Sequence, residues 1–338
     1  MKFKSLKAVF SIAATFIGTV VGAGFASGQE IYQFFTVYGV LGFPGLILAT
    51  VILGWASNKV FQIGLRLSTP SYREILLYLL GPRFLPAADF FFLLFLLLLT
   101  AVMFAGSGMV FKELNLEYGL GIGLTLVILV GVLYRGLPGL VKVNELVIPL
   151  MFTVCLIVTG YAIITRCPVG QQPETHGNWI LGALQFSAYN LILAVPVLLA
   201  LARDYPDRAL LQMGSWLGSL ALGGLAFLIH AAIIVHHQQL LNRALPMVVL
   251  AKMMNHWFYW GYALILWGEM LTTLLANVYG LGQRLAVWSG WPLRRWVWLI
   301  GIAGIIVARL GFVKLIAGFY PIYGFLSLVL LLLLIVKE

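Results

Sequence analysis

Long apolar runs recur along the whole chain, and they restrict its fold more than any other feature of the sequence. Each run is close to the length of about 20 residues that a helix needs to cross a bilayer. Of the 338 residues, 62% are hydrophobic and 9% are charged, against about 45–50% and about 25% in a soluble domain. Strands of an outer-membrane barrel would be shorter and would alternate in polarity. The sequence therefore predicts an all-α integral membrane protein.

Ten transmembrane spans can be delimited within one transporter-sized domain, residues 1–338. The first span is too long for one plain helix and contains a glycine-rich interruption. The spans are residues 8–38, 40–63, 87–111, 118–134, 141–165, 177–202, 209–235, 257–282, 292–308 and 313–336.

The distribution of Lys and Arg predicts how these spans are oriented. If the N-terminus lies inside the cell and the spans alternate, 15 of the 21 basic residues fall on the inner side and 6 on the outer side. Positive charge concentrates on the cytoplasmic side of membrane proteins. We therefore expect a multi-pass protein of a bacterial-type inner (plasma) membrane, in contact with lipid, with both termini cytoplasmic. Because the basic residues do not cluster on one soluble face, the net charge of +10 does not indicate a nucleic-acid partner.

The layout of the spans indicates an internal repeat of two halves, about residues 5–165 and 177–336. Breaks are expected near residues 22–28 of the first span and 190–196 of the sixth. Five spans per half is an odd number, so the second half must be inverted relative to the first. Interrupted helices in corresponding positions of inverted repeats are typical of transporter sites.

Two long connections support the same repeat. Residues 66–86 join the second and third spans, and residues 236–256 join the seventh and eighth. Each connection contains a short helical pattern, Ser71–Leu80 in the first and Pro246–Met254 in the second.

The segment from Gly18 to Glu30 is the most informative part of the chain. Its four glycines each lower helix propensity by up to about 1 kcal/mol, which favours an unwound stretch. Unwinding frees carbonyl groups for a cation and amides for an anion. A close helix-packing face is the alternative, because the glycines also form two small-xxx-small patterns. Gln29 and Glu30 favour a site, since polar and ionisable groups inside a span are candidates for function. The glycines are Gly18, Gly22, Gly24 and Gly28.

The run from Gly18 to Glu30, followed by Ile31-Tyr32-Gln33-Phe34-Phe35, resembles the first-helix signature of the YkvI-type amino-acid permeases. These belong to the amino acid–polyamine–organocation (APC) superfamily, with the leucine-transporter (LeuT) fold. The layout resembles that fold over nearly the whole chain, with a five-plus-five inverted repeat and with helices 1 and 6 interrupted.

The resemblance implies specific roles around the first break. The backbone of Gly22, Ala23 and Gly24 would receive a substrate carboxylate, and the carbonyl groups of Gly18 and Val21 would face a sodium ion. The residues that follow the break in the same signature, Phe25, Gln29 and Glu30, are further candidates for substrate binding.

The eighth span carries a polar face formed by Glu269, Thr272 and Thr273, which share one side of a helix at i, i+3 and i+4. Hydroxyl and carboxylate oxygens suit hard cations, and the resemblance places the two threonines at a sodium site. The alternative for the threonines is a hydroxyl bonded back to its own helix. Glu269 would ligate the cation or carry a proton, because a carboxylate within a span is costly unless it is paired, hydrated or protonated.

Other spans contribute weaker candidates. The resemblance makes Tyr189 and Asn190 substrate-facing, beside the break expected at Pro196. Thr100 and Met103 share a face of the third span and are also substrate-binding candidates, with packing as the alternative. Two groups are expected to serve other purposes, Tyr320 and Tyr323 in packing, and His176, His230, His236, His237 and His256 as solvated loop residues.

Together these features predict a cation-coupled secondary transporter of amino acids or related small zwitterions, working by alternating access. Na+ or H+ is the expected coupling ion, and no other cofactor is expected. The alternative is a transporter-like membrane receptor or sensor that binds a small ligand without moving it. No enzymatic activity is expected, since the sequence has no HExxH motif and no Ser/His or Cys/His pairing. The oligomeric state is not specified by the sequence.

Overall fold

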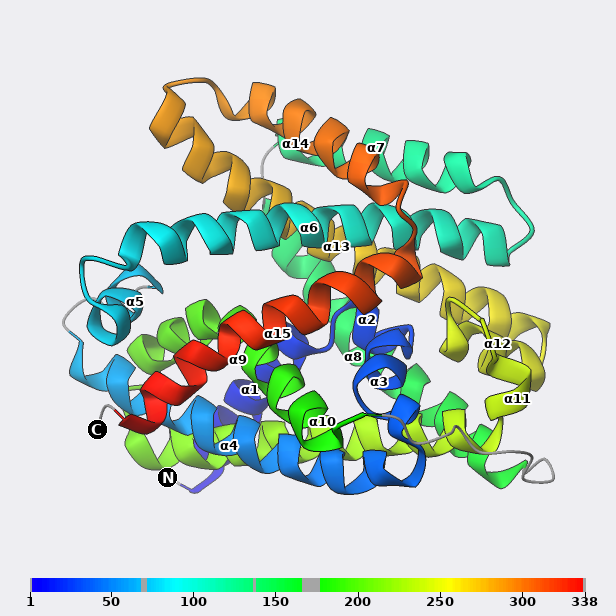
Figure 1. Ribbon diagram of the computed structural model, residues 1–338, viewed down its shortest axis with the longest axis horizontal. Coiled ribbons are helices and arrows are strands. Elements are labelled where there is room, and N and C mark those ends of the chain that lie inside the picture. The colour runs from blue at the N-terminus through cyan, green and yellow to red at the C-terminus, as the bar shows by residue number, and fades with distance from the viewer. Residues whose placement is uncertain (1, 68–71, 136–137, 166–176, 337–338) are drawn as a thin grey trace.

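A computed structural model describes residues 2–67, 72–135, 138–165 and 177–336. Over these ranges the chain forms helices and no strand. Most of the helices run along the long axis of the molecule (Figure 1). The elements are α1 (Lys2–Val20), α2 (Ala23–Ala26), α3 (Gln29–Phe34), η1 (Thr36–Leu41), α4 (Gly42–Arg66), α5 (Tyr72–Leu80), α6 (Leu85–Glu113), α7 (Tyr118–Arg135), α8 (Pro138–Ile164), α9 (Trp179–Asp204), α10 (Arg208–Val235), α11 (His237–Leu240), α12 (Pro246–Met254), α13 (His256–Ser289), α14 (Leu293–Ala308) and α15 (Phe312–Val336).

Seven helical segments in the described ranges are long and apolar enough to cross a membrane. Two shorter apolar helices, Ser5–Val20 and Tyr118–Tyr134, add to them. The long segments are Thr36–Arg66, Leu85–Glu113, Val147–Ile164, Trp179–Asp204, Arg208–Val235, His256–Ser289 and Phe312–Val336. This arrangement confirms an all-α multi-pass membrane architecture.

The helices pack as two groups. In the first group, α4 contacts α9 and α10, and α1 contacts the same two helices. In the second group, α6 contacts α7, α13 and α14. Two further helices, α8 and α15, contact members of both groups. In Figure 1 the second group forms the upper layers and the first group the lower ones.

The break expected in the first span is present. Helix α1 ends at Val20, and Gly22 has an extended backbone with φ −100° and ψ −176°. The short helix α2 follows, and Gly28 then adopts a left-handed conformation at φ 81° before α3 begins. That conformation strains residues with a side chain but not glycine. The clustered glycines therefore do interrupt this span, as the sequence predicts.

The prediction of a break in the sixth span is wrong. Helix α9 continues through residues 190–196 to Asp204, with Pro196 inside it. Proline removes one backbone hydrogen bond, but the chain has no glycine between Ala183 and Asp204. Packing against α4, α1 and α15 keeps the remaining helical bonds in place. A single proline among well-packed, helix-forming residues is thus not enough to unwind α9.

The two predicted short helices in the long connections are confirmed. Helix α5 covers Tyr72–Leu80, while Ser71 lies outside the described residues, and α12 covers Pro246–Met254. The start of α1 and the end of α15 lie at the same end of the molecule (Figure 1). Helix α5 lies at that end as well, and α12 lies toward the opposite one.

Three histidines are buried, contrary to the expectation of solvated loop residues. His230 lies within α10, and its Nδ1 is 3.0 Å from the Thr36 hydroxyl. His236 places Nε2 2.8 Å from the Ala162 carbonyl oxygen. His237 stacks on Tyr32 with ring centroids 6.3 Å apart. The expectation failed for His230 because it lies inside the predicted span 209–235, which is α10, and for His236 and His237 because the residues directly after that helix are also buried. His256 is exposed, as expected, and His176 lies outside the described residues.

Candidate functional site

A cavity of about 660 Å³ lies between the two helix groups, at the break after α1. Its walls come from α1 and the break, α3, α6, α8, α9, α13 and α15. Eleven residues proposed from the sequence line it, namely Gly18, Gly22, Ala23, Gly24, Glu30, Met103, Tyr189, Asn190, Glu269, Thr272 and Thr273. Residues separated by up to 255 positions in the sequence therefore meet around one space.

Four proposed residues do not line this cavity. Phe25 points into the packing between α4, α9 and α10, and the side chain of Val21 is buried. The Thr100 hydroxyl donates to the Leu96 carbonyl at 2.8 Å. Gln29 is buried, and its Oε1 has no hydrogen-bond partner among the described residues. A shared helix face does not guarantee that all of its residues reach the same cavity.

The Glu30 carboxylate lies at the closed end of the cavity and accepts a hydrogen bond from a tyrosine. The Tyr189 hydroxyl donates to Oε2, and Tyr320, whose ring packs against that of Tyr189, lies beside them. Gly24 allows the arrangement, because a Cβ atom there would lie only 2.7 Å from Glu30 Cδ and would overlap the carboxylate. Side chains from α3, α9 and α15 thus converge on the unwound segment.

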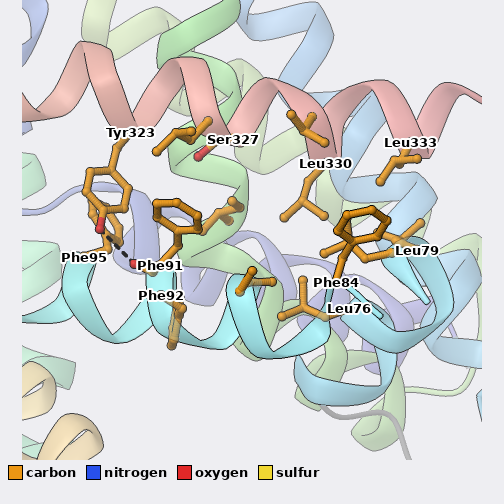
Figure 2. Close-up of a pocket in the computed structure, with 16 residues that line it drawn as sticks. Leu76, Leu79, Phe84, Phe91, Phe92, Phe95, Tyr323, Ser327, Leu330 and Leu333 are labelled. Carbon is orange, nitrogen blue, oxygen red and sulfur yellow. Dashed lines mark hydrogen bonds between the residues drawn. The ribbon is translucent and has the colours of Figure 1, made fainter. Parts of the chain in front are cut away.

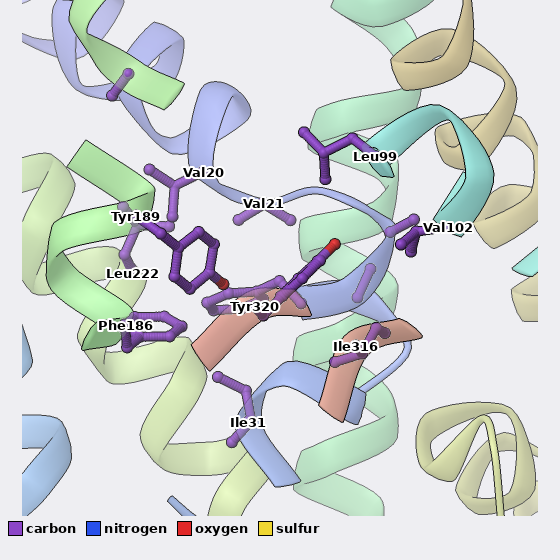
Figure 3. Packing of buried hydrophobic residues seen from close by; sticks show 14 of the residues in the cluster. Val20, Val21, Ile31, Leu99, Val102, Phe186, Tyr189, Leu222, Ile316 and Tyr320 are labelled. Carbon is purple, nitrogen blue, oxygen red and sulfur yellow. The ribbon is translucent and has the colours of Figure 1, made fainter. Parts of the chain in front are cut away.

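Tyr320 belongs to the site, although the sequence favoured a packing role for it. Its ring centroid lies 5.3 Å from that of Tyr189, and both rings line the cavity. Figure 3 shows the two rings next to each other, near Val20 and Val21, and their planes are tilted by 49°. Phe34 stacks on the Tyr189 ring at 5.5 Å. Aromatic residues beside a proline, here Pro321, are a weak signal that does not separate packing from binding.

Polar groups of α13 line the opposite wall. Glu269 is 3% exposed, and its Oε2 has no hydrogen-bond partner among the described residues. The Thr272 hydroxyl donates to the Glu269 carbonyl at 3.1 Å, which leaves its oxygen lone pairs available. Thr273 and Asn277 line the cavity on the same side. The Asn277 Nδ2 also has no partner among the described residues.

Tyr262 of α13 connects this wall to the broken span. Its hydroxyl donates to the Ala26 carbonyl at 2.5 Å and lies 3.0 Å from Cys155 Sγ of α8. All three residues are buried. The end of α2 is therefore held by a side chain from the other helix group.

The cavity opens beside Ala14 and Thr15 of α1, on the N-terminal side of the break. Four of its lining residues at that end are exposed, Ala14, Thr15, Pro149 and Ala276. At the deep end, Gly24, Glu30, Met103, Tyr189 and Tyr320 are buried. On the far side of the break, the Met247 amide of α12 donates to the Ser27 carbonyl at 3.1 Å.

A second hollow, about 430 Å³ in volume, lies between α5, α6 and α15 (Figure 2). Its lining is leucine- and phenylalanine-rich. The Tyr323 hydroxyl that faces it donates to the Phe91 carbonyl at 2.8 Å, and no ionisable carboxyl or basic group of the described residues lines it. The polar cavity at the break is the better candidate for a binding site.

Comparison with solved structures identifies the fold. The inward-facing conformation of Mhp1, a nucleobase-cation-symport-1 family transporter, matches 96% of this chain and 75% of its own with a TM-score of 0.64 at 13% identity. The closed conformation of Mhp1 with bromovinylhydantoin bound matches 94% of this chain and 74% of its own chain, with a TM-score of 0.58 at 15% identity. A manganese transporter of Eremococcus coleocola matches 100% of this chain and 87% of its own, with a TM-score of 0.54 at 14% identity. The fold is that of LeuT-like transporters.

Sequence comparison gives a nearer relative. No protein-family model matches the chain. The uncharacterized membrane protein YkvI of Bacillus subtilis is 30% identical over 326 residues, which cover 94% of this chain and 92% of YkvI. An identity of this level along nearly the full length of both chains places the protein in the YkvI family of membrane proteins.

Proposed function

We propose that the protein is a cation-coupled secondary transporter that moves amino acids or related small zwitterions by alternating access. The observation that supports this most is the cavity at the broken first span. It brings together unwound backbone, two carboxylates and hydroxyl groups from both helix groups. Irregular backbone within a membrane is tolerated where it lines a cavity, and in secondary transporters such a break holds the substrate and the coupling ion.

The proposed membrane topology has ten spans in a five-plus-five inverted repeat. The first span comprises α1 to α3, and the other nine are α4, α6, α7, α8, α9, α10, α13, α14 and α15. The short helices α5 and α12 occupy equivalent connections in the two halves. Both termini lie in the cytoplasm in this topology, because Lys and Arg concentrate on that side.

Alternating access would move the two helix groups relative to each other. The cavity opens beside Ala14 and Thr15 of α1, on the N-terminal side of the break, which the charge bias assigns to the cytoplasm. The conformation is then inward-open. The higher TM-score of the inward-facing form of Mhp1, 0.64 against 0.58 for the closed form, supports the same assignment.

The coupling ion is Na+ or H+ in this proposal. The Thr272 and Thr273 hydroxyls and the Gly18 carbonyl are an oxygen-rich set of the kind that Na+ prefers, and all three residues line the cavity. Val21 does not line it, so its carbonyl would join this set only after a rearrangement of the break. Glu269 offers a carboxylate to either ion. Among the described residues, no group of three or more His, Cys, Asp or Glu side chains gathers as a transition-metal site would require.

Uptake into liposomes tests the proposal. The purified protein is reconstituted, and accumulation of a panel of labelled amino acids is measured with an inward Na+ gradient, an inward H+ gradient, or neither. Gradient-dependent accumulation of at least one compound supports a transporter. Loss of Na+-driven uptake in the Thr272→Ala/Thr273→Ala variant assigns the ion to the threonines. Binding of a compound without any accumulation would favour the receptor function instead.

A further inference from the structure

Among the residues whose side chains the structure describes, the charges that line the central cavity are unbalanced. The carboxyl groups of Glu30 and Glu269 line it, and no described Lys, Arg or His does. A buried carboxylate within a membrane is costly unless it is paired, hydrated or protonated. A positively charged occupant would offset the charge of both groups.

The two carboxyl groups differ in how they are bonded. Glu30 accepts a hydrogen bond from the Tyr189 hydroxyl, so the protein itself provides a donor for that group. Glu269 lines the cavity and is 97% buried, and its Oε2 is covered by protein and has no partner among the described residues. Buried polar atoms in native proteins nearly always have a partner. The Glu269 carboxyl group would therefore gain a donor by turning toward a group bound in the cavity.

The remaining walls suit the non-polar part of a small organic cation. Leu96, Leu99 and Met103 of α6 and Leu193 and Val197 of α9 form apolar surfaces. Tyr189 and Tyr320 also line the cavity, but the Tyr189 ring packs against the rings of Phe34 and Tyr320. The walls thus combine anionic and aliphatic surfaces.

We propose that the substrate carries a net positive charge and that its ammonium or guanidinium group binds the Glu269 carboxylate. This inference rests on the proposed transporter function, and it changes the expected substrate from a neutral zwitterion to a cationic amino acid or a related amine. A neutral zwitterion adds no net charge, so it leaves the two carboxylates to the coupling cation alone. A cationic substrate compensates one of them itself and supplies a donor to the Glu269 carboxylate. Glu30, held by the Tyr189 hydroxyl, contributes to the negative potential without contacting the cationic group.

Equilibrium binding to the purified full-length protein in detergent tests the charge preference without requiring transport. Two matched pairs isolate the positive charge. Lysine differs from norleucine by one ammonium group, and phenethylamine differs from phenylalanine by the absence of a carboxylate. A charge-assisted hydrogen bond of about 1.5–3 kcal/mol corresponds to about a tenfold to a hundredfold difference in affinity. We expect the cationic member of at least one pair to bind more tightly by that factor.

Three variants test whether Glu269 is responsible for the tighter binding of cationic compounds. Glu269→Gln should abolish it by weakening binding of the cation tenfold or more while leaving binding of the zwitterion unchanged. Glu269→Asp keeps the charge and should keep the preference. Glu117→Gln removes an exposed carboxylate outside the cavity and serves as the matched control. Thermal unfolding of each variant in the same detergent establishes that it is folded.

Each result has a defined meaning. Equal or tighter binding of the zwitterions, or binding of neither cation at millimolar concentration, overturns the proposal. So does a Glu269→Gln variant that binds the cation normally but loses a pH dependence of uptake, because Glu269 would then carry the coupling proton. Failure of the transporter function itself is distinct. It would appear as charge-selective binding in detergent without gradient-driven accumulation in liposomes.

Discussion

The contact between Gly24 and the Glu30 carboxylate predicts whether replacing Gly24 by alanine stabilises or destabilises the protein. A Cβ atom at position 24 would lie 2.7 Å from Glu30 Cδ and 2.8 Å from Cγ, too close for either to remain in place. Gly24→Ala should therefore displace the carboxylate from the hydroxyl of Tyr189. We expect a destabilised protein with an altered cavity.

Two opposing contributions set how much Gly24→Ala changes the free energy of unfolding. Replacing glycine by alanine inside a helix stabilises by about 0.5–1 kcal/mol, and Gly24 lies in α2. Leaving the buried Glu30 and Tyr189 oxygens without their hydrogen bond costs about 1–3 kcal/mol. The net destabilisation is then up to about 2.5 kcal/mol. Without the overlap between the new Cβ atom and the Glu30 side chain, the same substitution would stabilise the protein.

Gly22→Ala provides the matched control. Gly22 lies two residues away at the same break, and a Cβ atom there has nothing within 4 Å. Its backbone is extended, so alanine is tolerated and should stabilise by up to about 1 kcal/mol through the unfolded state. The two substitutions are therefore expected to change the free energy of unfolding in opposite directions.

Unfolding in mixed micelles, followed by tryptophan fluorescence as denaturing detergent is added, measures both changes. A double-mutant cycle with Tyr189→Phe sharpens the result. If Gly24→Ala already breaks the bond to Tyr189, the two effects will be less than additive. A Gly24→Ala protein as stable as Gly22→Ala, or strictly additive effects, would refute the reasoning.

Three further predictions concern groups away from the carboxylates. Tyr262→Phe leaves the buried Ala26 carbonyl without its 2.5 Å partner, and should lower the free energy of unfolding by about 1–3 kcal/mol, measured in mixed micelles. Asn178→Ala removes a cap that accepts the Ile180 amide at 3.0 Å, and should cost about 1 kcal/mol in the same measurement. Burial lowers the pKa of His237 below its usual 6.5. The unfolded chain therefore binds a proton more readily, and stability should fall as the pH drops below 6.5, less so in His237→Gln.

Controls accompany these predictions. Tyr161→Phe removes an exposed hydroxyl from α8 and should leave stability unchanged. Asn178→Asp retains the capping oxygen and should retain the stability that Asn178→Ala loses. A His237→Gln protein with the same pH profile as the parent would contradict a contribution of this side chain to acid sensitivity.

The sequence predicted the first broken span and the polar face of α13 because both patterns act locally. Clustered glycines weaken a helix wherever they lie, and the i, i+3, i+4 spacing of Glu269, Thr272 and Thr273 places them together on any helix. The short helices α5 and α12 were also recognised, since each shows a helical pattern within a long connection.

The sequence failed where the outcome depends on packing between distant elements. Pro196 suggested a break, but neighbouring helices keep α9 continuous. Thr100 shares the third span with Met103, yet only Met103 lines the cavity. The contact of Tyr320 with Glu30 joins residues 290 positions apart. No local periodicity encodes such a contact.

The attachment of α12 to the broken span has a consequence for inhibitors. The Met247 amide bonds the Ser27 carbonyl, and Gly28 packs beside Met247 and Pro246. The surface of α12 on the far side from the cavity mouth is therefore mechanically connected to the backbone that forms the deep end of the cavity. An antibody fragment that fixes α12 against α3 would hold the protein in one state without entering the cavity. By reciprocity of coupled equilibria, ligands in the cavity would change the affinity of that fragment by the same factor.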